Sequence, residues 1–287
     1  MTAARRSLLA PALATLVVLL LTLASTPATA DPQWASVDDA TIHPGVQMYT
    51  DGAQCTANFI FYSTDAQTGD VADMYIGYAA HCAGLGSQTD TNGCTTQSLD
   101  YGTEVDIAGA SQPGTLAYSS WQAMQDANET DANACAGNDF ALVLIDPADH
   151  DKVNPSIPFW GGPQGINTDG VSLGERIFSY GNSSLRPTDS ILSRKEGYAV
   201  QTGSGGWLHT VYTTSPGIPG DSGSAYLDSE GRALGVVSTL ALAPLALSNN
   251  VSDLNKALDY AITNGGLDIQ LAEGTEVFDP GLGTMLG

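Results

Sequence analysis

Three short segments of the sequence carry residue types that together can perform nucleophilic catalysis. Ser222 lies within the motif Gly-Asp-Ser-Gly, His81 lies between two alanines and a cysteine, and Asp139 follows an asparagine and precedes an apolar run. A serine hydroxyl becomes a nucleophile when a base removes its proton, and a neutral imidazole can do so near pH 7. A buried carboxylate fixes the imidazole tautomer and stabilises the cation that forms. We therefore predict that His81, Asp139 and Ser222 form a catalytic triad.

The glycines that flank Ser222 have a separate use. They allow a sharp backbone turn, so that the N–H groups of Gly220 and Ser222 can converge on one point. Donors arranged in this way stabilise the oxyanion of a tetrahedral intermediate. We expect an oxyanion hole at Gly220 and Ser222.

The order His81, Asp139, Ser222 and the three local motifs resemble those of the chymotrypsin/trypsin family of serine peptidases, in its secreted bacterial type. The resemblance covers roughly residues 45–265. It implies an all-β fold of two six-stranded antiparallel β-barrels packed against each other, with a C-terminal helix. It implies that His81 is the general base, Asp139 its orienting partner and Ser222 the nucleophile of a serine endopeptidase that needs no cofactor. Protein or peptide substrates would be its partners.

Four cysteines, Cys55, Cys82, Cys94 and Cys135, predict two disulfides in an exported chain, with three possible pairings. In the family a disulfide brackets the catalytic histidine. The resemblance therefore implies the pair Cys55–Cys82, with Cys94–Cys135 as the second disulfide. No cysteine or histidine spacing typical of a zinc site occurs, so we expect no metal.

Substrate preference should depend on the segments beside Ser222. Trypsin-like members carry an aspartate six residues before the nucleophile, where this chain has Pro216. The family's Ser-Trp-Gly segment, which lines the substrate pocket, corresponds to Ser238-Thr239-Leu240. Leu240 would fill part of the pocket mouth. We predict that Pro216, Ser238, Thr239 and Leu240 contact substrate and that cleavage follows small or medium apolar residues.

The start of the mature chain allows two readings. In the family, the aspartate equivalent to Asp221 can pair with an N-terminal ammonium that processing releases. Residues 31–40 contain three acids and do not match such an activation end. Either residues 31 to about 42 form a short propeptide, with the active chain beginning near Thr41 or Ile42, or Asp221 finds its partner within the chain.

Many short β-like runs separated by turn residues predict an all-β domain. The runs are 57–62, 74–79, 102–107, 140–145, 176–180, 197–201, 207–213, 224–228 and 233–239. Proline and glycine mark a linker at about 146–165, which divides a first barrel (about 41–145) from a second (about 166–265) within one peptidase domain (31–287). The periodicity of residues 250–264 predicts a helix. The tail, 266–287, has no assigned role.

Residues 1–30 have the charged start, apolar run and Ala-Thr-Ala end of a signal peptide. We expect a secreted, extracellular monomer that leaves the membrane after signal cleavage. The remaining chain has seven Lys and Arg against 31 Asp and Glu, a net charge of −24. Such a charge repels nucleic acid and anionic lipid, so neither is an expected partner.

Two alternatives differ from a peptidase. A catalytically silent member of the family could serve as a binding module, if Leu240 obstructs productive binding. A secreted esterase of the α/β-hydrolase type would need Gly-x-Ser-x-Gly, but Ser224 occupies the final glycine position. The β-rich pattern also disagrees with that fold.

Overall fold

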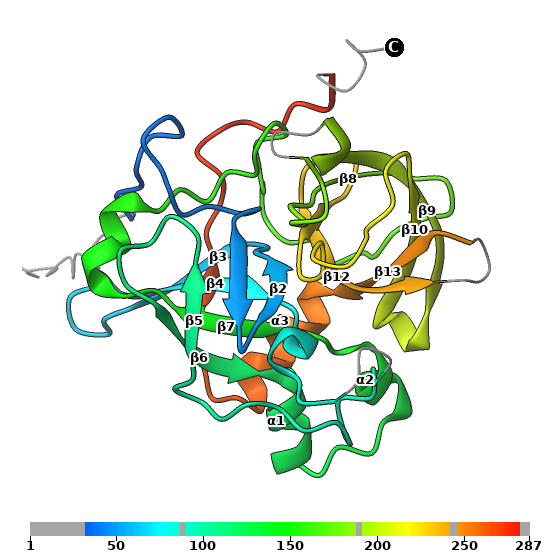
Figure 1. Cartoon of the computed structure of the whole chain (residues 1–287), viewed down its shortest axis with the longest axis horizontal. Helices are drawn as coiled ribbons and strands as arrows, with labels where there is room; N and C mark the ends of the chain where they lie inside the picture. The colour runs from blue at the N-terminus through cyan, green and yellow to red at the C-terminus, as the bar shows by residue number, and fades with distance from the viewer. Residues whose placement is uncertain (1–31, 87–89, 188–190, 242–245, 282–287) are drawn as a thin grey trace, which may run out of the picture.

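The computed structural model describes residues 32–86, 90–187, 191–241 and 246–281, which form two β units side by side (Figure 1). The first unit contains seven strands of the N-terminal half and one strand of the tail: β1 (Gln47–Thr50), β2 (Ala53–Thr56), β3 (Ile60–Thr64), β4 (Val71–Tyr78), β5 (Glu104–Ile107), β6 (Gly114–Ser119), β7 (Ala141–Leu144) and β14 (Gln270–Leu271). The second unit contains β8 (Arg176–Tyr180), β9 (Arg194–Gly203), β10 (Leu208–Thr213), β11 (Ala225–Leu227), β12 (Ala233–Ala241) and β13 (Ser248–Asp253).

The two units differ in closure. In the first, the strands form an antiparallel sheet in the order β14-β3-β4-β7-β6-β5-β1-β2. In the second, the order β10-β13-β12-β11-β8-β9 closes into a six-stranded barrel. The predicted fold class is confirmed, because the chain is mostly β with a C-terminal helix. The first sheet has eight strands rather than six: seven come from the N-terminal half, and the tail adds β14.

The described helices are short. They are α1 (Ser120–Asp126), α2 (Ala132–Gly137), α3 (Leu254–Thr263) and the 3₁₀ turns η1 (Ala80–Ala83), η2 (Pro147–Lys152), η3 (Ile191–Ser193) and η4 (Ser204–Gly206). The predicted helix 250–264 begins four residues late, because residues 250–253 belong to β13. The Asp253 carboxylate accepts a hydrogen bond from the Lys256 N–H and caps α3. Within the described part of the chain, no helix combines the length and apolar composition needed to cross a membrane.

The apolar core continues from one unit to the other. Aromatic side chains fill the first unit, where the Phe61 and Phe140 rings meet edge to face. The same cluster reaches Phe178 and Val236 of the barrel. A smaller cluster fills the barrel interior with β-branched and aromatic residues, including Val211. Because burying apolar surface dominates folding free energy, this shared core holds the facing edges of both units in place.

Residues that precede the first strand are part of the folded unit. The Ala35 N–H donates to the Val153 carbonyl, and Ile42 forms a parallel bridge with Val153. Ile42 is fully buried. Residues 35–42 therefore pack against the segment that follows η2.

The tail, which had no assigned role, holds the linker against the first sheet. Strand β14 pairs with β3, and beyond it Gly162 donates its N–H to the Glu276 carbonyl. The Phe278 ring packs edge to face against Phe178, with centroids 5.1 Å apart. The tail therefore bridges both units.

Replacing Phe278 with Ala should lower the free energy of unfolding by about 3 kcal/mol, the usual cost of truncating a buried phenylalanine. Val277 provides a matched control, because its side chain is 75% exposed. Val277→Ala should change stability by less than about 0.5 kcal/mol. Chemical denaturation measures both values. Equal stabilities of the two variants would show that the tail contributes nothing to the fold.

Candidate active site

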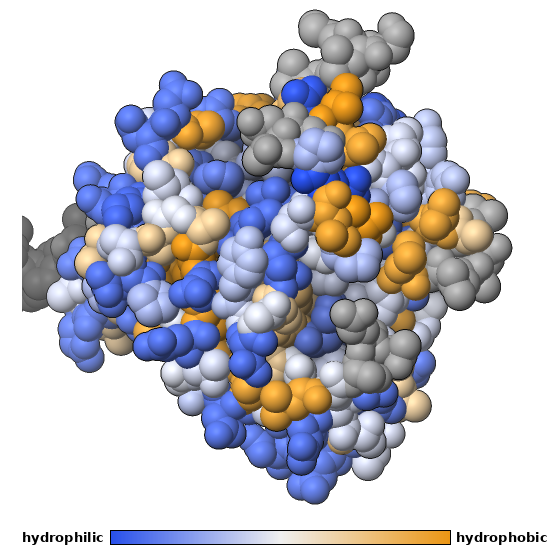
Figure 2. All heavy atoms as spheres, viewed as in Figure 1, coloured by the Kyte–Doolittle hydropathy of each residue, from blue (hydrophilic) through white to orange (hydrophobic). Residues whose placement is uncertain are grey.

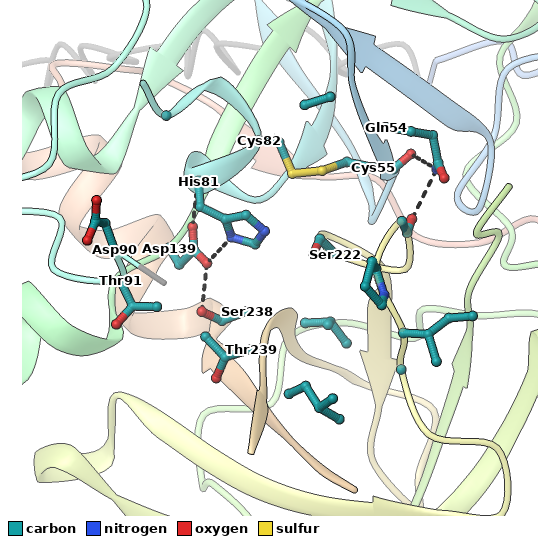
Figure 3. A pocket seen from close by; sticks show the side chains of 18 of the residues that line it. Gln54, Cys55, His81, Cys82, Asp90, Thr91, Asp139, Ser222, Ser238 and Thr239 are labelled. Carbon is teal, nitrogen blue, oxygen red and sulfur yellow. Dashed lines mark hydrogen bonds and ion pairs between the residues drawn. A yellow bond between two sulfur atoms is a disulfide. The ribbon is translucent and has the colours of Figure 1, made fainter. Parts of the chain in front are cut away.

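Three separate elements supply the predicted triad residues. His81 lies in η1, directly after β4 ends, and Asp139 lies between α2 and β7. Ser222 lies in the loop between β10 and β11 of the barrel. Figure 3 shows the His81 ring between Asp139 and the side of the pocket that carries Ser222. The fold thus brings all three side chains, distant in sequence, to one pocket.

Asp139 is held by three donors. The His81 Nδ1 lies 2.7 Å from Asp139 Oδ2, and the backbone N–H of His81 donates to Oδ1 at 2.9 Å. The Ser238 hydroxyl of β12 donates to Oδ2 at 2.6 Å. Because an ionised carboxylate only accepts, Nδ1 carries the ring proton. The other ring nitrogen, Nε2, is left as the basic atom.

The pKa values of this pair move in opposite directions. Burial lowers the pKa of His81, but the charge and hydrogen bond of Asp139 outweigh burial and hold it above its ordinary value of 6.5. Burial raises the pKa of Asp139, but the charge of His81 and the hydrogen bonds from His81 and Ser238 hold it below 3.8. Asp139 is therefore ionised throughout the range in which His81 titrates.

Peptide hydrolysis should fall on the acid side as His81 becomes protonated, because the imidazolium cannot accept the serine proton. The value of kcat/KM should drop about tenfold per pH unit below the pKa of His81. The midpoint should lie above pH 6.5, since Asp139 raises that pKa. A pH profile of initial rates measures it. An unchanged rate down to pH 5 would exclude His81 as the base.

The backbone before Ser222 is anchored through its carbonyl groups. The Gly220 carbonyl accepts from Thr56 Oγ1 at 2.7 Å and from Gln54 Nε2 at 3.0 Å, and the Ser222 carbonyl accepts from the Thr56 N–H at 2.8 Å. Gly220 has φ +95°, which favours glycine. Among the described residues, the N–H groups of Gly220 and Ser222 donate to no acceptor. Both donors are free for a ligand.

Asp221, between these two donors, is satisfied within the chain. Its Oδ2 accepts from Lys195 Nζ at 2.5 Å and from Arg186 Nη2 at 2.6 Å. The Ser183 N–H donates to Oδ1 at 3.0 Å. Of the two readings of the mature N-terminus, the structure agrees with the second, because Asp221 needs no terminal ammonium.

A cavity of about 790 Å³ connects these groups. Its lining comes from both units and includes Gln54, His81, Asp139, Ser222, Ser238, Thr239, Leu240 and Asn249. Three of the four predicted substrate contacts are therefore part of this cavity. Pro216 is not part of its lining. The Pro216 carbonyl instead accepts from Arg186 Nη2 at 2.7 Å.

Asn249 joins two walls of this cavity. Its Oδ1 accepts from the Gly217 N–H at 2.7 Å, while Nδ2 lies 3.4 Å from the Thr239 carbonyl. The Asn249 side chain is buried. It packs so closely on Gly217 that a Cβ at that position would lie only 2.8 Å from Asn249 Nδ2, so a larger residue would collide with the amide. No local sequence signal marks Asn249, and the predicted helix 250–264 overlaps most of its strand.

Ser252 of β13 supports Asp139 from the barrel side. Its hydroxyl donates to the Gly137 carbonyl at 2.6 Å and accepts from the Asp139 N–H at 3.2 Å. Ser252 is fully buried. It fixes the backbone that carries Asp139, and no local sequence signal points to it.

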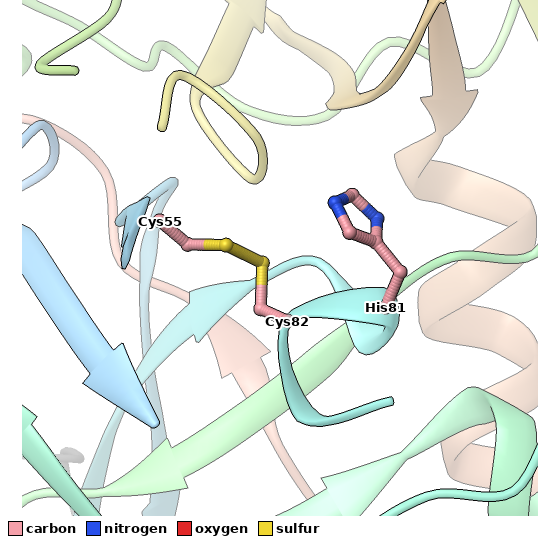
Figure 4. Close-up of side chains that lie close together, drawn as sticks. All are labelled: Cys55, His81 and Cys82. Carbon is pink, nitrogen blue, oxygen red and sulfur yellow. A yellow bond between two sulfur atoms is a disulfide. The ribbon is translucent and has the colours of Figure 1, made fainter. Parts of the chain in front are cut away.

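The disulfides are Cys55–Cys82 and Cys94–Cys135, the pairs that the resemblance implies. The first lies beside His81 (Figure 4), and ligand atoms of Cys55, Cys82 and His81 lie within 4.8 Å of one another. Both sulfurs are consumed by the disulfide, so neither can act as a thiolate ligand. The disulfide joins β2 to η1, the turn that carries His81, and so restrains the position of that residue.

A six-stranded barrel beside an antiparallel sheet, with a cavity between them, is the architecture of the chymotrypsin-like proteases. No protein-family model matches the sequence, and no curated protein matches it. Among solved structures, Thermobifida fusca protease A is 20% identical with a TM-score of 0.50, over 82% of this chain and all of that chain. A Glu endopeptidase solved in complex with MPD is 16% identical with a TM-score of 0.51, over 84% of this chain and all of that chain. The chain therefore has the chymotrypsin-like serine protease fold.

Proposed function

We propose that the protein is a secreted serine endopeptidase that uses His81, Asp139 and Ser222. The observation that carries this proposal is the hydrogen-bonded pair of His81 and Asp139, supported by Ser238, in the same cavity as Ser222. Two free N–H groups beside Ser222 complete the set of parts that acyl transfer requires.

Each of these residues has a defined role in the reaction. Ser222 Oγ forms a bond to the substrate carbonyl carbon while His81 Nε2 takes its proton, and the carbonyl π pair moves onto oxygen. The N–H groups of Gly220 and Ser222 stabilise that oxyanion. His81 then returns the proton to the leaving amine, and water repeats the sequence to release the acid. No cofactor enters these steps.

Digestion of a denatured protein mixture, followed by mass spectrometry of the fragments, tests this function. New termini should appear in samples with the intact protein and be absent when a fluorophosphonate has been added beforehand. Absence of new termini from a correctly folded protein would favour the binding-module alternative.

We propose that cleavage follows small or medium apolar residues. Leu240 stands at the cavity with 45% of its surface exposed, and the Asn249 amide bridges two of the walls. A long substrate side chain would have to displace either the Leu240 side chain or the Asn249 amide. The stretch from Pro216 to Gly220 contains no acidic residue, so the segment before Ser222 offers a basic side chain no counter-charge.

A panel of peptides that vary only the residue before the scissile bond measures this preference. The value of kcat/KM should be at least about tenfold higher for Ala or Val than for Phe, Arg or Lys. Asn249→Ala should raise turnover after Phe by removing the bridging amide. Asn167→Ala is the matched control and should keep the preference of the unaltered protein, because that buried amide bonds Asp228 and Gly170 and does not line the cavity. Faster turnover after Arg, Lys or Phe in the unaltered protein would contradict the preference.

We propose an extracellular location. The predicted signal peptide, residues 1–30, lies outside the described residues. Two disulfides support an oxidising compartment. The face in Figure 2 is largely hydrophilic, with hydrophobic residues in separate patches, as is common on proteins exposed to water.

A further inference from the structure

Two buried cations share one carboxylate behind the candidate oxyanion hole. Lys195 of β9 and Arg186 of the loop after β8 both donate to Asp221 Oδ2. The side chains of Lys195 and Asp221 are fully buried, and that of Arg186 is 7% exposed. We name these three residues the Lys–Asp–Arg cluster.

The Lys–Asp–Arg cluster carries more positive than negative charge. One cation is enough to neutralise Asp221, and taking a second out of water is unfavourable. In the described part of the chain, neither Lys195 nor Arg186 forms an ion pair with a second carboxylate. Glu196, next to Lys195 along β9, instead pairs with Arg176. The net charge of the cluster is +1 when Lys195 is protonated.

The net positive charge of the cluster contrasts with the strongly acidic composition of the chain. Residues 31–287 contain only seven Lys and Arg against 31 acids, yet two of the seven contact Asp221. The Arg186 Nε is buried and has no hydrogen-bond partner among the described residues. A structural ion pair would need neither the second cation nor that unpaired donor.

The cluster lies directly behind the two candidate oxyanion donors. Asp221 is the residue between Gly220 and Ser222, and the Ser222 N–H belongs to the peptide bond that Asp221 begins. Asp221 Oδ2 also accepts from the Ile218 N–H at 3.1 Å, which ties the carboxylate to the same loop. A positive charge at this place acts on an oxyanion through protein of low dielectric constant rather than through water.

We propose that Lys195 and Arg186 are positioning residues that hold a net positive charge behind the oxyanion hole, where it stabilises the tetrahedral intermediate. This inference rests on the proposed function. It implies that loss of the Lys195 proton removes part of that stabilisation and slows the reaction at alkaline pH.

The surroundings of Lys195 lower its pKa, so that it loses its proton within the pH range of an enzyme assay. Burial lowers the pKa of Lys195 to about 8, although Asp221 opposes that shift, and the charge of Arg186 lowers it further. Tyr226 of β11 also lies near the cluster, and burial raises the pKa of its hydroxyl, so it stays neutral in this range. Asp221 stays ionised, because both cations hold its pKa below 3.8 against the effect of burial.

The test is the pH profile of kcat from pH 6 to 10, with active enzyme counted by fluorophosphonate titration. The unaltered protein should lose about tenfold in kcat above pH 8, less than the 10²–10³ typical of a lost oxyanion donor. Lys195→Met should have a plateau lower by about tenfold and no alkaline decline, since it leaves a neutral Arg–Asp pair. Arg186→Met should shift the decline to higher pH, because the Arg186 charge no longer lowers the pKa of Lys195.

Arg176→Met is the matched control. It removes an arginine of the adjacent strand that pairs with Glu196 and is partly exposed, and it should keep the profile of the unaltered protein. If Lys195→Met does not fold, as judged by thermal unfolding, the unaltered protein and Arg186→Met decide the question.

The outcomes separate this inference from the proposed function. Turnover without an alkaline decline, or a Lys195→Met variant with an unchanged plateau and decline, overturns the role of the cluster alone. Absence of both labelling and turnover in the folded protein removes the proposed function, and this inference with it.

Discussion

Replacing Ser222 with Ala should reduce kcat for peptide hydrolysis by about 10⁶-fold, the loss typical of removing the nucleophile from such a triad. The N–H groups of Gly220 and Ser222, which have no acceptor among the described residues, would stabilise the intermediate that this hydroxyl forms. The fold should be unaffected, since the Ser222 side chain is partly exposed in the cavity. Peptide turnover and thermal unfolding of the purified variant measure both expectations.

Ser224 provides the matched control for this substitution. It lies two residues further along the same segment and is fully buried, and its Oγ has no hydrogen-bond partner among the described residues. Ser224→Ala should keep the turnover of the unaltered protein within a few-fold. Comparable losses in both variants would indicate a structural effect and would contradict Ser222 as the nucleophile.

Replacing Asp139 with Asn should lower kcat by about 10⁴-fold. Asparagine is close to the same size, but its NH₂ group cannot accept the proton that His81 Nδ1 carries. The favoured ring tautomer then places its proton on Nε2, where the base is needed. Loss of the carboxylate charge should also lower the pKa of His81, so the acid limb of the pH profile should move to lower pH. Steady-state rates across pH test both effects.

Asp149→Asn is the control for a buried carboxylate in the same unit. Asp149 is fully buried and accepts from Ser111, Gln112 and Lys152, none of which lines the cavity. This variant should lose stability but keep its kcat and its acid limb. Near-normal activity of Asp139→Asn would show that a different carboxylate orients the imidazole.

Local sequence signals were sufficient for the fold class. Alternating strands with turns between them predicted a β architecture, and β8, at 176–180, matches its predicted range. The predicted helix 250–264 extends into the polar run 248–253, which is a strand although Asn and Ser carry no strand signal. It becomes a strand because it pairs on both sides, with β10 and with β12. Because this pairing involves segments that are distant in sequence, the local residue pattern could not predict it.

In the candidate site too, some residues stand in local motifs that the sequence reveals, and others are brought to the site only by the fold. His81, Asp139 and Ser222 stand in local motifs, so the sequence could point to them, and their catalytic roles stay predictions. Lys195 and Asn249 belong to no recognisable motif. Lys195 acquires meaning only because the fold buries it against Asp221, and Asn249 because the fold sets it across two cavity walls. No spacing rule could have selected either residue.

The most direct test of the central claim is reaction of the folded protein with a fluorophosphonate, followed by peptide mapping. A base and an oxyanion hole are both needed to activate serine toward this reagent. One equivalent of label on Ser222, greatly reduced in His81→Ala, is the predicted result. A folded protein that takes up no label, or takes it up on another serine, would contradict the proposed site.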